Sequence, residues 1–86
     1  PQSKETAILM MADSVEAASR SLKDYSTQAL DNLVDHIIDG QVNDGMFRDS
    51  PISFKDIETI KGAFKKRLQT IYHGRVAYPE LKKPGA

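Results

Sequence analysis

The sequence has no cysteine, few aromatic residues and no excess of charge of either sign. Without cysteine, disulfide bonds and thiolate metal sites are excluded, so any metal must be held by histidine, aspartate or glutamate. Twelve basic and twelve acidic residues give zero net charge, and only three tyrosines and three phenylalanines are present. This composition argues against binding to a nucleic-acid polymer. The longest apolar run, residues 7–12, is far shorter than the roughly 20 residues of a transmembrane helix.

The start of the chain predicts that it is a piece of a longer polypeptide. It opens on Pro1-Gln2-Ser3, without an initiator methionine, a charged leader or an apolar signal segment. A chain of this length buries only about 60 to 65% of its unfolded surface, which leaves a small core. We therefore expect little interior space for a complete active site.

The hydrophobic pattern predicts an all-α fold, a bundle-like arrangement of three helices at about residues 3–22, 27–39 and 53–73. Residues 1–79 form the helical portion, and residues 80–86 are expected to be a flexible tail. Gly40 and Gly74 are the expected C-terminal stops of the second and third helices.

Serine and threonine residues mark the three helix starts. Ser3 is the expected N-cap of the first helix, and Ser26 or Thr27 that of the second. Ser53 should cap the third helix in a capping box with Asp56, while Ile52 packs on Ile57 as a hydrophobic staple. Between the second and third helices, Met46 and Phe47 are the expected anchors of a turn-rich segment.

The first helix is apolar over most of its circumference. Its main stripe consists of Ile8, Met11, Ala12, Val15, Ala18 and Leu22. Leu9 and Met10 lie off this stripe, which is typical of a helix at the centre of a larger protein. The isolated chain is accordingly expected to self-associate through Ile8, Leu9, Met11 and Val15.

Leu9, Asp13, Glu16 and Arg20 share one row of the first helix. Glu16 and Arg20, four residues apart, fit an ordinary surface ion pair. For Asp13 two interpretations stay open: a solvent-facing residue, or an inward-pointing carboxylate held by a strong partner such as a metal ion. An unpaired buried carboxylate is too costly to keep its charge, so the second interpretation requires that partner.

A resemblance to a known family rests on residues 1–3 (PQS), 7–18 (AILMMADSVEAA), 53–57 (SFKDI) and 73–79 (HGRVAYP). These segments are similar to the end of the catalytic domain of HD-superfamily metal phosphohydrolases. More narrowly, the chain resembles the cytoplasmic domain of membrane-anchored, seven-transmembrane-receptor HD hydrolases, whose described members cleave cyclic di-AMP. The likeness spans roughly residues 1–79.

The resemblance implies that Asp13 is the last metal ligand of such a site. The other ligands, histidines and an adjacent His-Asp pair, should lie upstream of Pro1, on helices that are partners of this segment. One or two divalent ions of the manganese, iron or magnesium class would bind in the full-length protein, with none bound to these 86 residues alone. The isolated chain is then expected to be inactive toward the cyclic dinucleotide, and Arg20 could contact a substrate phosphate.

Several other features have simpler interpretations. Lys61, Lys65, Lys66 and Arg67 follow the third helix and are expected to be a solvated face rather than a nucleic-acid stripe. His36 should be solvated, and His73 suits the last turn of a helix. The alternative to the enzyme hypothesis is a self-contained three-helix interaction module, in which residues 8–12 bind a partner helix and Asp13 has no catalytic part.

Overall fold

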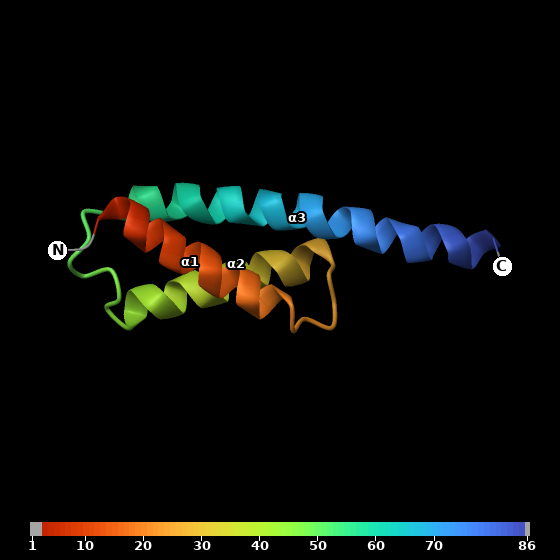
Figure 1. Cartoon of the computed structure of the whole chain (residues 1–86), viewed down its shortest axis with the longest axis horizontal. Coiled ribbons are helices and arrows are strands. Elements are labelled where there is room, and N and C mark those ends of the chain that lie inside the picture. Colours follow the sequence, from red (N-terminus) through yellow and green to blue (C-terminus); the bar gives the residue numbers. More distant parts are fainter. Residues whose placement is uncertain (1–2, 86) are drawn as a thin grey trace.

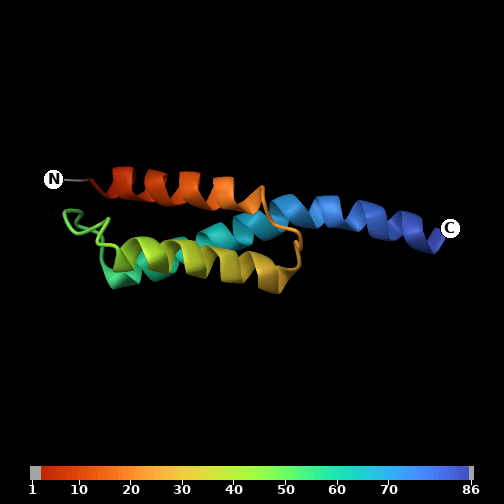
Figure 2. The same cartoon turned by 90° about the horizontal axis from the view of Figure 1, so that it is seen from below.

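A computed structural model describes the backbone of residues 3–85 and the side chains of residues 3–72. It contains three helices, α1 (Lys4–Ser19), α2 (Thr27–Asn43) and α3 (Phe54–Gly85), and no strand in the described range. The all-α prediction is therefore confirmed. The helix α2 packs against both α1 and α3, which touch each other much less. The last part of α3 extends past the other two helices (Figures 1 and 2).

All three helices begin where the sequence predicts. The Thr6 and Ala29 amides donate to the Ser3 and Ser26 hydroxyls, so these serines are the N-caps of α1 and α2. At the start of α3, the Asp56 amide donates to Ser53 Oγ and the Ser53 amide donates to the Asp56 carboxylate. This reciprocal pair is a complete capping box.

The predicted end of α2 at Gly40 is wrong, because the helix continues to Asn43 and terminates through Gly45. Gly45 has a φ of 75°, in the left-handed region that glycine adopts without strain. The Met46 amide donates to the Gln41 carbonyl and the Gly45 amide to the Val42 carbonyl. These two bonds form a Schellman motif, which satisfies the last carbonyls of the helix.

The predicted end of α3 at His73 is also wrong, since the helix continues through Gly74 and Pro79 to Gly85. A glycine inside a helix costs only about 1 kcal/mol, so Gly74 is a weak stop. The side chain of His73 lies outside the described side chains, and the flexibility expected of residues 80–86 remains a prediction.

One small hydrophobic core joins the three helices. Its buried members are Ala7, Met11, Val15, Leu30, Val34, Ile38, Phe47, Ile57, Leu68 and Tyr72. The stripe of α1 is rotated relative to the prediction, because Ala7 and Ser19 are fully buried while Ile8 and Ala12 are only half-buried. Of the two expected anchors in the turn, Phe47 is buried and Met46 is exposed.

No helix in the described part of the chain is both long enough and apolar enough to cross a membrane. The helix α3 has the necessary length, but charged and polar residues are distributed along it.

Candidate metal-ligand site on the first helix

Asp13 lies in the middle of α1, on the side turned away from the core. Its side chain is exposed and makes no hydrogen bond or ion pair with any described residue. Of the two interpretations, the solvent-facing one describes Asp13 within these 86 residues, because the buried positions Met11 and Val15 lie on the opposite side of α1. Both carboxylate oxygens are free to bind a cation supplied from outside these 86 residues.

Glu16 and Arg20 form the ion pair that their spacing predicts. Arg20 Nη2 lies 3.4 Å from Glu16 Oε2, and both side chains are about 70% exposed (72% and 67%). An exposed pair of this kind stabilises a helix by only a few tenths of a kcal/mol. Arg20, which is the C-cap residue of α1, can therefore exchange this partner for another anion at little cost.

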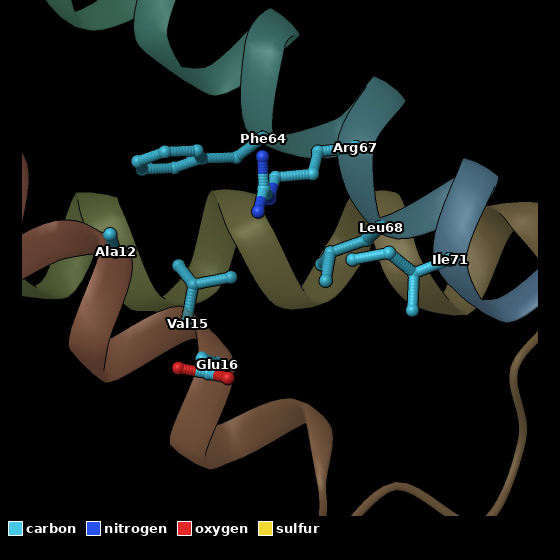
Figure 3. Close-up of a pocket in the computed structure, with 7 residues that line it drawn as sticks. All are labelled: Ala12, Val15, Glu16, Phe64, Arg67, Leu68 and Ile71. Atoms are coloured by element: carbon cyan, nitrogen blue, oxygen red, sulfur yellow. The ribbon is translucent and has the colours of Figure 1, made fainter.

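A groove of about 330 Å³ separates α1 from α3. Its lining residues are Ala12, Val15, Glu16, Phe64, Arg67, Leu68 and Ile71. Figure 3 shows Glu16 on α1 and Arg67 on α3 at opposite sides of this groove, with Val15 between them and the other apolar side chains to either side. Leu9 and Ile71 are 62% and 45% exposed, so the neighbouring surface is partly apolar as well.

The residues expected to mediate self-association are only partly exposed. Met11 and Val15 are buried in the chain's own core, at 0% and 3% exposure, so their assignment to an interface is wrong. Both belong to the core-facing stripe of α1, which packs mainly against α2. Leu9 and half-buried Ile8 remain the surface members of the set.

The basic residues of α3 do not form a uniform solvated face. Lys61 is only 8% exposed, and its ammonium lies 2.6 Å from Asp39 Oδ1 and 3.8 Å from Asp35 Oδ1 on α2. Lys65 pairs with Asp35 at 2.9 Å. The prediction that Lys61 is solvated is wrong, because carboxylates of α2 lie beside its ammonium. Lys66 and Arg67 are exposed, as is His36, for which the prediction is confirmed.

Two pKa shifts accompany these ion pairs. The hydrogen bond from Lys61 to Asp39 raises the pKa of the Lys61 ammonium, although burial opposes it. At the entry to α3, the Ser53 amide and then the Lys4 ammonium lower the pKa of the Asp56 carboxyl. Lys4 Nζ lies 3.2 Å from Asp56 Oδ2, so this pair also connects the starts of α1 and α3.

Two polar contacts between helices, one buried and one part-buried, were not predicted from the sequence. Ser19 Oγ lies 2.9 Å from the Tyr72 hydroxyl, and Gln41 Nε2 donates to Ser14 Oγ at 2.7 Å. The burial of Ser19 could have been predicted from its position four residues after Val15, which continues the buried stripe of α1. Among the described side chains, no group of three histidine, aspartate or glutamate residues lies close enough to hold a metal ion. Asp13 is thus at most one ligand of a site completed by other polypeptide.

Comparison with known proteins identifies the relatives of this chain. It is 42% identical over 83 residues to the cyclic-di-AMP phosphodiesterase PgpH of Bacillus subtilis, and 38% identical over 82 residues to PgpH of Listeria monocytogenes. The chain is related to a segment of the PgpH phosphodiesterases. An uncharacterized protein of Synechocystis is 36% identical over 80 residues.

The matches cover 96%, 95% and 93% of this chain, but only 12%, 11% and 10% of the respective relatives. The chain therefore spans about a tenth of the length of the proteins it matches. No family model and no solved structure matches it.

Proposed function

We propose that residues 1–79 are the C-terminal helical portion of an HD-type metal phosphohydrolase domain, which in its parent protein hydrolyses cyclic di-AMP. The main support is the match to PgpH proteins, named as cyclic-di-AMP phosphodiesterases, over nearly the whole chain. The parent is proposed to be a membrane-anchored bacterial protein with this domain in the cytoplasm. The HD-type domain and the membrane-anchored parent are both proposed from the resemblance of residues 7–18 and 73–79 to HD hydrolases.

Asp13 is the proposed last metal ligand. Its carboxylate is exposed and has no partner among the described residues, and its hard anionic oxygens suit a divalent ion of the manganese, iron or magnesium class. When bound, such an ion polarises a phosphate and lowers the pKa of a water molecule. Because this chain supplies one ligand, histidines and a His-Asp pair from the rest of the parent must complete the site. The 86 residues alone should bind metal weakly and hydrolyse nothing.

Arg20 is the proposed contact to a substrate phosphate. It follows Asp13 by seven residues, or about 10 Å along the helix axis, on the same side of α1. Its long side chain can extend back toward the metal side, and its guanidinium fits two phosphate oxygens at once. The competing contact to Glu16 is exposed and weak, so a phosphate can displace it.

The α1/α3 groove is proposed as the surface that the metal-ligand helices of the parent cover. Ala12, Val15 and Phe64 are among its apolar lining residues, while Glu16 and Arg67 offer one charge of each sign at its sides. A helix lying over this groove would lie beside the face of α1 that carries Asp13. The additional ligands would then come within range of the Asp13 carboxylate.

The competing function is an interaction module without catalysis. One observation favours it: the three helices bury a common core within these 86 residues, and the groove remains open to a partner helix. In that case the groove would bind a separate protein, and Asp13 would be an ordinary surface residue.

Hydrolysis of cyclic di-AMP by the purified parent separates the two functions. Asp13→Ala should lower kcat by at least about 100-fold, because the metal loses an anionic ligand. Glu5→Gln, which removes an exposed carboxylate from the first turn of the same helix, outside the groove, is the matched control and should keep kcat within a few-fold. Equal activity of Asp13→Ala and the unaltered parent would exclude the metal-ligand role.

A further inference from the structure

Ser19 is the only fully buried polar residue described in α1, and three hydrogen bonds surround it. Its side chain is 0% exposed. Ser19 Oγ donates to the Glu16 carbonyl at 2.7 Å, which occupies its single proton. The Tyr72 hydroxyl, 2.9 Å away, therefore donates to Ser19 Oγ. In this way α3 holds the last turn of α1 by a directional contact.

Tyr25 contacts the backbone of the same residue. Its hydroxyl donates to the Ser19 carbonyl at 2.8 Å, and its ring stacks on that of Tyr72 with a centroid separation of 4.4 Å. Tyr25 belongs to the segment between α1 and α2, whereas Tyr72 belongs to α3. The Ser19 network, consisting of Ser19, Tyr25 and Tyr72, thus ties the side chain and the backbone of one residue to two other parts of the chain.

The directional contacts of this network oppose a rotation of α1 about its own axis. Hydrophobic contacts are non-directional and tolerate small rotations, whereas hydrogen bonds weaken steeply with angle. Ser14, next to Asp13, adds one further directional contact through Gln41 on α2. Direct packing between α1 and α3 is sparse along the groove, so on this side of α1 the Ser19 network adds to the packing against α2 in opposing a rotation.

We propose that Tyr72 and Tyr25 are positioning residues, which aim the Asp13 carboxylate by fixing the axial rotation of α1 through Ser19. The inference rests on the proposed function of Asp13 as a metal ligand. Asp13 lies six residues before Ser19, about 9 Å along the axis and about 120° around it. A side-chain oxygen about 6 Å from the axis moves by about 1 Å when the helix rotates by 10°. Metal-ligand distances tolerate only about 0.2 Å, so such a rotation weakens binding.

The test measures manganese affinity of the purified parent by calorimetric titration with Mn²⁺. Tyr72→Phe keeps the stacked ring and removes only the hydroxyl that contacts Ser19 Oγ, and Tyr25→Phe removes only the hydroxyl that contacts the Ser19 carbonyl. Each change should weaken Mn²⁺ binding about 10-fold, the lower end of the effect of losing an outer contact to a metal ligand. Ile57→Val removes one buried methylene from the first turn of α3, away from Ser19, and is the control for general destabilisation. It should change the affinity by less than about 2-fold.

A double-mutant cycle with Asp13 gives the readout that a purely structural role would not move. In an Asp13→Ala background, Tyr72→Phe should cause no additional loss of Mn²⁺ affinity, because the aimed ligand is already absent. A further loss in that background, or an effect of Tyr72→Phe no larger than that of Ile57→Val, would overturn the positioning role. If Asp13→Ala alone left Mn²⁺ affinity unchanged, the proposed metal-ligand function would fail first, and the positioning role with it.

Discussion

Replacing Lys61 by methionine should destabilise the 86-residue chain by about 1 kcal/mol. Methionine keeps the length and apolar stem of the side chain, so the change removes the ammonium without opening a large cavity. The ammonium contacts three carboxylates, those of Asp39 at 2.6 Å, Glu58 at 3.4 Å and Asp35 at 3.8 Å. Two of these, Asp35 and Asp39, lie on α2, so Lys61 connects α2 to α3, as Lys65 does through Asp35.

The magnitude follows from the unequal burial of the partners. A hydrogen bond between charged groups contributes about 1.5 to 3 kcal/mol when well shielded from water. The Asp39 side chain is 57% exposed, so solvent screens it and the lower part of that range applies. Methionine also recovers the cost of burying the Lys61 ammonium, which reduces the net loss to about 1 kcal/mol.

Buried ion pairs can often be replaced by apolar residues without loss, so the sign of this effect is informative. Here only Lys61 is buried, while Asp35, Asp39 and Glu58 stay partly or largely exposed. The raised pKa of Lys61 means that its partners favour the charged form more than burial disfavours it. That contribution is complete below the ordinary lysine pKa of about 10.4, and it is lost as the pH rises through the raised value of the folded state.

Urea unfolding at pH 7, followed by circular dichroism, measures the effect. With a slope of about 1 kcal/mol/M, Lys61→Met should lower the midpoint by about 1 M. Lys66→Met, an exposed change on the same helix, is the control and should shift stability by no more than about 0.5 kcal/mol. An equal or higher midpoint for Lys61→Met at unchanged slope would refute the reasoning.

Two further predictions concern the ends of the helices. Asp56→Asn should reduce the loss of folding stability at acidic pH, because the lowered pKa of Asp56 contributes stability above about pH 4 that is lost as the carboxylate is protonated. The free energy of unfolding, measured from pH 6 to pH 2.5, tests this. An equal loss of stability in the variant and the unaltered chain would contradict it. Gly45→Ala should cost about 1 kcal/mol and lower Tm by about 4 to 8 °C, since alanine is strained at a φ of 75°. A Tm unchanged by Gly45→Ala would show that the left-handed turn is not needed to end α2.

The helix starts could be predicted from the sequence because each depends on residues close together in the chain. Ser3, Ser26 and Ser53 all bind amides three residues further on. The end of α2 was harder, since Gly40 and Gly45 both fit a stop. Extending the helix past Gly40 lets Gln41 bond to Ser14 on α1, a tertiary contact that local sequence does not encode.

The side chain at the centre of the candidate site could be named from the sequence, but its direction could not. Periodicity gives the relative positions of Met11, Asp13 and Val15 on α1, whereas the absolute rotation depends on what packs against the helix. Fully buried Ser19, held by Tyr72, belongs to the inner face despite being polar. The burial of Lys61 could likewise not be predicted from its polar character, because its partner Asp39 lies on another helix.

The most direct test of the account is the position of manganese in a crystal of the parent protein, located by anomalous scattering. The account predicts a peak about 2.0 to 2.3 Å from a carboxylate oxygen of Asp13, with histidines from other parts of the parent in the same coordination shell. A fully occupied manganese site surrounded by other residues, with Asp13 directed into solvent, would contradict it.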